Sequence, residues 1–112
     1  MIDLSYRSQE VEIMDDLSCG GKVLDQTLQE LETINRLLGG NGVTLHGLTK
    51  LLKNTKENNL VIGDLGCGGG DMLLLVHRWA LKHHLTVNLV GIDANQHAIE
   101  FARQNTRHVP SI

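Results

Sequence analysis

The sequence predicts an α/β protein in which part of a doubly wound parallel sheet follows a helical N-terminal region. Two short apolar runs, at residues 60–65 and 87–93, each carry an aspartate at or next to their end. A segment of helical composition separates these runs, and another follows the second. Strand–helix–strand crossovers of this size pair their strands in parallel with a right-handed connection. We therefore expect a first βαβα unit at residues 59–112, after a helical cap region at residues 1–58.

Two helices are expected in the cap region. Apolar residues spaced three or four apart predict an amphipathic helix from Leu24 to Leu38, and Gly39 follows in the position that a helix C-cap favours. A second, shorter helix is expected to begin with Thr44 as its cap. Its inward and outward residues are expected to be, respectively, Leu45, Leu48, Leu51 and Leu52, and Lys50, Lys53 and Lys56. Residues 8–16 are a third candidate helix.

The second half of the chain alternates between strand and helix patterns. Residues 60–65 and 87–93 are expected to be strands because of their length and β-branched content. Residues 71–83 are rich in leucine and long enough for a helix. A last helix is expected at residues 94–106, with Ala98, Ile99 and Ala102 inward. Residues 108–112 resemble the approach to a third strand, and the two N-terminal helices are expected to cover one sheet face.

Composition excludes several classes of protein. The 112 residues include 10 Lys and Arg against 13 Asp and Glu, and 41% are apolar, which suits one domain with a core. No run approaches the roughly 18 apolar residues that span a bilayer, and the N-terminus lacks a signal-peptide pattern. No basic block is present to neutralise phosphates. We therefore expect a cytoplasmic protein that binds neither membranes nor nucleic acid.

The candidate ligand site is the glycine loop at residues 66–70, which follows the first predicted strand. Glycines there let a ligand approach the backbone, and the next helix begins with unpaired N–H groups. No Lys-Ser or Lys-Thr pair follows, which excludes a Walker loop, and Asp71 occupies the third glycine position of the dinucleotide pattern G-x-G-x-x-G. Asp64 and Asp71 flank the loop, so a cationic amine or sulfonium suits the site better than a pyrophosphate.

A third acid, Asp93, ends the second predicted strand, about where an acid hydrogen-bonds ribose hydroxyls in nucleoside sites. Structural interpretations remain open for these residues. The loop could be a plain connection, Asp64 could cap it, and Asp93 could be the N-cap of the last helix. Cys67 is interpreted as a small packing residue because no partner base is evident. The six histidines show no metal-ligand spacing, so no metal site is expected.

Two segments together resemble motifs of the class I S-adenosylmethionine-dependent methyltransferases. Val-Ile-Gly-Asp-Leu-Gly-Cys-Gly-Gly-Gly, residues 61–70, is similar to motif I, an acid followed by G-x-G-x-G. Leu-Val-Gly-Ile-Asp-Ala, residues 89–94, is similar to the second motif. Residues 12–15 and 35–40 are similar to the helical cap of some members that act on small molecules. The resemblance covers the chain from residue 60 onward and implies a Rossmann-like fold, S-adenosyl-L-methionine as cofactor and methyl transfer to a small-molecule substrate.

The resemblance also implies roles for individual residues. The implied cofactor contacts are Asp64, Gly66, Cys67, Gly68, Asp93 and Ala94. Asp64 would bind the methionine ammonium group, directly or through water. The loop backbone would lie against the methionine and ribose. Asp93 would accept hydrogen bonds from both ribose hydroxyls, and Ala94 would pack near the adenine. Arg36 is a candidate clamp for the cofactor carboxylate or a solvated helix residue. No catalytic residue, and no general base, can be assigned.

The family's sheet has seven strands, of which two are expected here. The chain is therefore expected to be the N-terminal, cofactor-binding part of such an enzyme, truncated and inactive alone. A first strand without a partner on its far side leads us to expect self-association. One alternative function is a non-catalytic module that binds a nucleoside cofactor or another protein. The other is an NAD-dependent oxidoreductase, which Asp64 and Asp71 disfavour.

Overall fold

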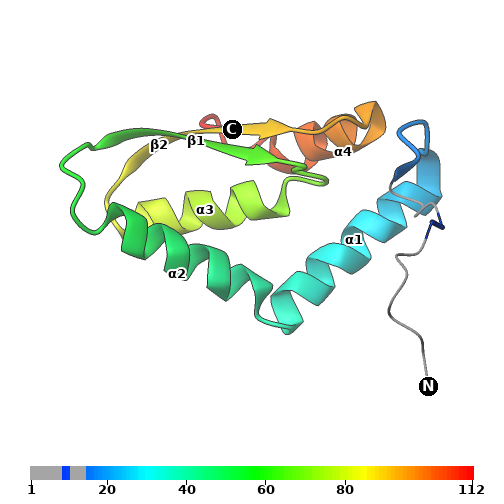
Figure 1. Cartoon of the computed structure of the whole chain (residues 1–112). Helices are drawn as coiled ribbons and strands as arrows, with labels where there is room; N and C mark the ends of the chain where they lie inside the picture. The colour runs from blue at the N-terminus through cyan, green and yellow to red at the C-terminus, as the bar shows by residue number, and fades with distance from the viewer. Residues whose placement is uncertain (1–8, 11–14) are drawn as a thin grey trace, which may run out of the picture.

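A computed structural model describes residues 9–10 and 15–112 of the chain (Figure 1). The elements within these residues are α1 (Gly21–Leu37), α2 (Gly40–Leu52), β1 (Asn59–Leu65), α3 (Asp71–Lys82), β2 (Thr86–Ile92) and α4 (Gln96–Thr106). The predicted α/β class and the βαβα order are confirmed. The candidate helix at residues 8–16 falls mostly outside the described residues.

The two strands pair in parallel and in full register, from Asn59 opposite Thr86 to Leu65 opposite Ile92. Helix α3 connects them and packs on one face of the sheet, where buried α3 side chains meet the inward residues of β2. The main core cluster consists of Cys67, Leu73, Val76, Trp79, Ala80, Val87 and Leu89. Because the strands are parallel and in register, their carboxyl ends meet at one edge of the sheet.

The opposite face of the sheet is apolar and exposed. Val61 and Leu65 of β1 are 75% and 80% exposed, and Val90 and Ile92 of β2 are about half exposed. The register places all four on the same face, which we call the open face. The expectation that the N-terminal helices cover a sheet face is wrong for α1, which contacts α4 and α2 (Figure 1). Helix α2 contacts α3, and its leucines reach the core cluster on the α3 side of the sheet.

Helices α1 and α2 join at Gly39, whose φ of +79° lies in the left-handed region. This confirms the expected end of the first helix, since glycine adopts that conformation without strain. The expectation that Thr44 caps the second helix is wrong. Helix α2 begins at Gly40, because the Gly39 carbonyl already accepts hydrogen bonds from the N–H groups of Gly42 and Val43.

The two N-terminal helices bury fewer leucines than expected. Leu45, Leu48 and Leu52 pack against the main core, but Leu51 is 77% exposed, which contradicts the prediction that it points inward. In α1, Leu24 and Leu28 are buried in a second cluster with Ala98, whereas the later apolar residues are exposed. The predicted apolar stripe is therefore used only in the first half of α1, which is the half that contacts α4.

Residues 108–112 form a turn and no strand. Val109 is buried, and the carbonyl of Ser111 accepts a hydrogen bond of 2.7 Å from the N–H of Leu89 in β2. The segment expected to approach a third strand therefore lies beside β2 without forming a ladder.

Candidate functional site

The glycine loop between β1 and α3 is fastened to the end of β2. The N–H groups of Gly66 and Cys67 both donate to the carbonyl of Ile92, at 2.7 and 3.1 Å. Gly66, Gly68 and Gly70 have φ values of +76°, +49° and +78°, which other residues rarely adopt. The alternating glycines are therefore needed for this backbone path, and the loop is more than a flexible connection.

Asp93 lies just after β2 and is held by two backbone donors. Its Oδ2 accepts from the N–H of Gly68, and its Oδ1 accepts from the N–H of Asn95, both at 2.9 Å. The interpretation of Asp93 as the N-cap of α4 is wrong. The N-cap is Asn95, whose side chain accepts from the N–H groups of His97 and Ala98. Asp93 instead ties the glycine loop to the start of α4.

Asp64, near the end of β1, has a different environment. Within the described part of the chain, no group donates a hydrogen bond to its half-buried carboxylate. Burial raises the pKa of Asp64, and the negative charges of Asp71 and Asp93 raise it further. The structure thus brings together the three acids that the sequence placed around the loop. Among the described residues, hydrogen bonds hold the carboxylate of Asp93 but not that of Asp64.

Cys67 belongs to the core rather than to the surface of the loop. Its side chain is buried beside Leu73 and Gly91, and a Cβ added at Gly91 would lie 2.9 Å from the Cys67 Sγ atom. Burial raises the pKa of the Cys67 thiol, and Asp93 and Asp64 raise it further. The thiol is therefore poorly suited to act as a nucleophile, and its interpretation as a packing residue is confirmed.

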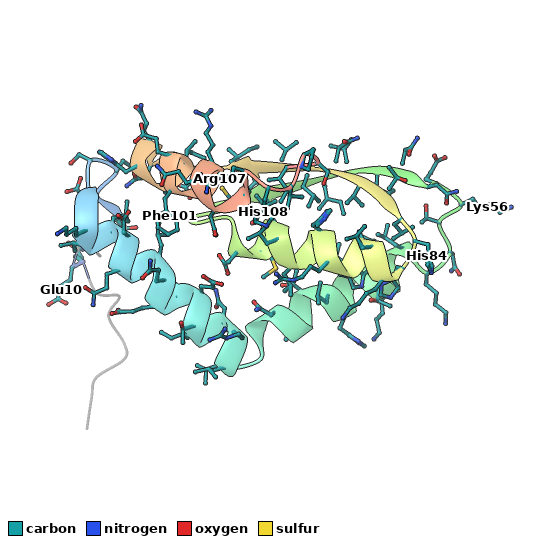
Figure 2. All side chains as sticks on the ribbon, turned by 180° about the vertical axis from the view of Figure 1, so that it is seen from behind. Glu10, Lys56, His84, Phe101, Arg107 and His108 are labelled. Atoms are coloured by element: carbon teal, nitrogen blue, oxygen red, sulfur yellow. The ribbon has the colours of Figure 1, made fainter. Side chains whose placement is uncertain are left out.

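Helices α1 and α4 hold the loop from two sides. A Cβ added at Gly68 would lie 3.2 Å from Leu28 of α1, and one added at Gly69 would lie 3.1 Å from Phe101 of α4. Figure 2 shows Phe101 extending from α4 toward α1. Asn105 Nδ2 also donates to the Gly69 carbonyl at 3.0 Å. The loop therefore depends on the N-terminal helix as well as on the sheet.

Sequence reasoning missed two of these supporting asparagines. A signal existed for Asn95, because an asparagine just before a helix is a preferred N-cap. Asn105, one of the residues that hold the loop, follows no local pattern. Of the remaining predicted site residues, Gly66 and Ala94 are exposed, and a Cβ added at Gly66 would meet nothing within 4 Å. Open space therefore adjoins the loop at Gly66.

Other candidate features lie elsewhere. Arg36 is exposed in the last turn of α1, at the end away from the loop (Figure 1). No group of three His, Cys, Asp or Glu side chains suited to a metal ion occurs in residues 9–10 and 15–112. Nor does that part of the chain contain a helix long and apolar enough to cross a membrane.

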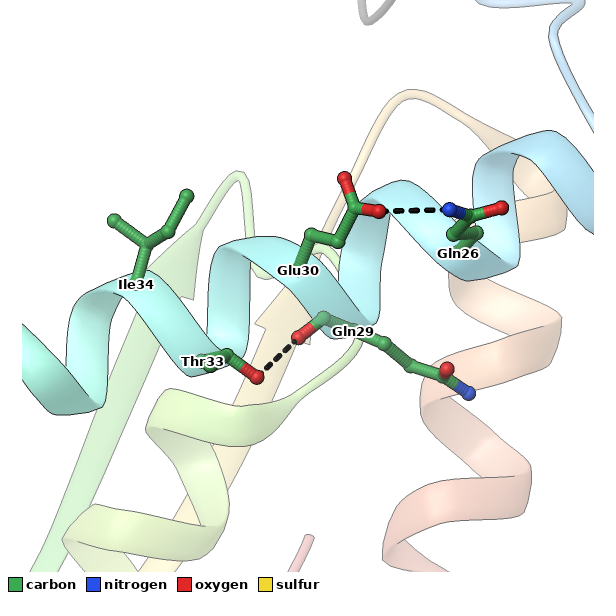
Figure 3. A pocket seen from close by; sticks show the side chains of 5 residues that line it. All are labelled: Gln26, Gln29, Glu30, Thr33 and Ile34. Carbon is green, nitrogen blue, oxygen red and sulfur yellow. Dashed lines mark hydrogen bonds between the residues drawn. The ribbon is translucent and has the colours of Figure 1, made fainter.

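One depression lies along α1 and involves no residue of the loop. It is lined by Gln26, Gln29, Glu30, Thr33 and Ile34 (Figure 3). Two of the polar side chains bond along the helix itself: Gln26 donates to Glu30 at 2.8 Å, and Thr33 donates to the Gln29 carbonyl at 3.0 Å. Because one exposed helix surface supplies all the lining, we assign the candidate site to the glycine loop.

Residues 56–110 match the family model of a methyltransferase domain. The matched segment begins just before β1 and extends past α4, so it contains the glycine loop and all three acids. The match, which covers just under half of the chain, confirms the resemblance of this segment to S-adenosylmethionine-dependent methyltransferases. No curated protein and no solved structure matches the chain.

Proposed function

We propose that this chain is the cofactor-binding part of an S-adenosylmethionine-dependent methyltransferase with a Rossmann-like fold and a small-molecule acceptor. Two observations support the proposal. Residues 56–110 match a methyltransferase domain, and three carboxylates surround a glycine loop at the carboxyl edge of parallel strands. Ligands of open α/β sheets bind at this edge.

The observation that carries the proposal is the environment of Asp64. Its carboxylate is half buried, receives no hydrogen bond from the described residues and faces the charges of Asp71 and Asp93. A cation placed there would favour the ionised form and remove the electrostatic cost. An ammonium or sulfonium group meets that need, whereas the pyrophosphate of NAD would add negative charge.

The loop and the strand ends also fit the rest of the cofactor. Asp64 would hold the ammonium group, and the backbone of residues 66–68 would lie along the methionine and ribose, where Gly66 borders open space. Asp93 would accept from the ribose hydroxyls, and exposed Ala94 would lie beside the adenine. Both oxygens of Asp93 already accept one backbone hydrogen bond, but a carboxylate has about four acceptor sites in all, so capacity remains.

When bound, the cofactor supplies an electrophilic methyl group on its sulfonium. The contribution of this chain is to bind and orient that group, and holding reactants in line provides much of the rate of such a transfer. None of the loop residues described above is placed as a general base. We therefore propose that the 112-residue chain binds the cofactor but does not complete methyl transfer alone.

Isothermal titration of the 112-residue chain with S-adenosylmethionine, S-adenosylhomocysteine and NAD tests the proposal. We expect the first two to bind with dissociation constants on the order of micromolar or weaker, and NAD to show no binding. Asp64→Asn should weaken the binding of S-adenosylmethionine. Asn88→Ser, which changes an exposed residue of β2, should leave that binding unchanged. Tight NAD binding without either methyl-cofactor ligand would overturn the proposal.

A further inference from the structure

The buried polar residue at the start of α4 uses every polar atom of its side chain. Asn95 is 3% exposed. Its Oδ1 accepts from the N–H groups of His97 and Ala98, at 2.9 and 3.2 Å. Its Nδ2 donates to the carbonyl of Cys19, at 2.9 Å, across 76 positions of sequence. An N-cap needs only the acceptor, so the donor serves a second purpose.

That second purpose is contact with the segment that leads into α1. Cys19 packs in the same cluster as Leu24, Leu28 and Ala98. Gly20 lies directly against the ring of His97, since a Cβ added at Gly20 would come within 2.5 Å of it. The segment at residues 19–28 is therefore docked on the start of α4 through a hydrogen bond and a close backbone approach.

These contacts form a closed circuit around the glycine loop. Leu28 contacts Gly68, whose N–H donates to Asp93, and Asp93 accepts from the N–H of Asn95. Asn95 then donates to Cys19, from which the chain leads back to Leu28. Asn95 is the member of this circuit that joins the acid at the end of β2 to the N-terminal segment.

We propose that Asn95 is the positioning residue for the Asp93 carboxylate, and that it makes recognition of a ribose diol depend on docking of residues 19–28. This inference rests on the proposed function, because Asp93 is the group expected to meet the ribose. Asn95 does not touch the ligand. It acts by fixing the backbone N–H that holds one oxygen of Asp93, and by keeping the N-terminal segment against the loop that holds the other.

Asn95→Ser separates the two purposes of the side chain. Serine also caps helices well, so α4 keeps its first turn, but its hydroxyl is too short to reach the Cys19 carbonyl. Asn95→Asp keeps both shape and cap, loses the donor and adds a charge beside Asp93, so its effect should be larger. Gly20→Ala disrupts the docking of residues 19–28 through a different contact, because the added Cβ meets the His97 ring. It leaves the Asn95 cap of α4 intact.

The measurement is the dissociation constant of S-adenosylhomocysteine and of its 2′,3′-dideoxy analogue, by isothermal titration of the 112-residue chain. The natural chain should prefer the diol by about tenfold or more, as expected for hydrogen bonds to a charged group. In Asn95→Ser and Gly20→Ala the preference should fall to about threefold or less. The double variant should lose little more of this preference than either single variant, because both changes undo the docking of the same segment.

Two control variants isolate the effect. Asn105→Ser removes the hydrogen bond to the Gly69 carbonyl. It should therefore raise the dissociation constants of both ligands by the same factor and keep the preference for the diol. Asn88→Ser changes an exposed asparagine of β2 and should leave both constants unchanged. Hydrogen exchange of the amides at residues 24–28 should be about tenfold faster in Asn95→Ser and unchanged in Asn88→Ser.

The outcomes separate the two proposals. If the natural chain binds neither ligand, the proposed function fails, and the role of Asn95 fails with it. If the natural chain prefers the diol and both Asn95→Ser and Gly20→Ala keep that preference, only the role of Asn95 is overturned. If Asn95→Ser does not fold, Gly20→Ala alone decides the matter by the same comparison.

Discussion

Two aspartates lie at the ends of neighbouring parallel strands, at the same edge of the sheet, yet their surroundings differ. Asp93 accepts hydrogen bonds from the N–H groups of Gly68 and Asn95. Asp64 receives none from the described residues, and burial and nearby charge raise its pKa. The carboxylate of Asp93 therefore stabilises the folded chain through its hydrogen bonds. The ionised carboxylate of Asp64 destabilises it. Two backbone hydrogen bonds give Asp93 a structural role, whereas the cationic ligand proposed above would give Asp64 a role in binding.

The largest expected effect is that of removing the carboxylate of Asp93, which two backbone N–H groups bind. Asp93→Ala leaves two backbone donors without their acceptor and removes the expected ribose contact. We expect it to weaken S-adenosylhomocysteine binding and to lower the free energy of unfolding, each by about 1.5–3 kcal/mol. Isothermal titration and urea unfolding measure the two quantities.

Cys67→Ala is the control for that change, because it alters the glycine loop that Asp93 holds without removing a charge. The buried thiol is lost, at a cost of about 1 kcal/mol in stability, and the backbone that would face the ligand remains. Ligand affinity should change little. Equal losses of affinity in the two variants would show that Asp93 supports the loop but does not contact the ligand.

Asp64→Asn should separate stability from binding. We expect the free energy of unfolding at pH 7 to rise by less than about 1 kcal/mol, because the carboxylate is half exposed and screened, while affinity for S-adenosylmethionine falls. The folded pKa of Asp64 lies above its usual value of 3.8, so the unfolded chain ionises first. The contribution of Asp64 to the stability of the natural chain is then lost as pH rises from 3.8 through the folded pKa.

Urea unfolding of the natural chain and of Asp64→Asn between pH 3 and 7 tests that sign. The difference between them should be small below pH 3.8, where Asp64 is protonated in both states, and should grow above it. A constant difference across this range would mean that the benefit of asparagine is not electrostatic.

The smallest expected effect is that of Asp71→Asn. This change removes one of the two charges that raise the pKa of Asp64, so that pKa should move down toward its usual value. It also removes an acid from the first turn of α3, where negative charge is favourable by a few tenths of a kcal/mol. Net stability should therefore hardly change. Carboxyl chemical shifts during a pH titration report this change in pKa, and an unmoved pKa would leave burial and the charge of Asp93 as the causes of the raised value.

Local pattern and parallel topology were enough to predict the loop and its acids. Asp64 and Asp93 follow apolar strand runs, and parallel pairing brings such residues to one edge. The predicted start of α2 was wrong because Gly40 and Gly42 are typical of a break between helices. In the structure the chain turns at Gly39, and both of the later glycines lie within α2. The hydrogen bond from Asn95 to Cys19 joins residues 76 positions apart and leaves no periodic signal. Nor does periodicity show which leucines of α1 and α2 meet a neighbour.

The open face of the sheet has a consequence for how any of these measurements depends on protein concentration. Val61, Leu65, Val90 and Ile92 are exposed together, and the outer edge of β1 has no strand partner in the described residues. We propose that copies of the chain associate through this surface. By mass action, the midpoint of thermal unfolding should then rise with concentration, and light scattering should show a growing mean mass. Val61→Lys should abolish both dependences, whereas a concentration-independent monomer would contradict the proposal.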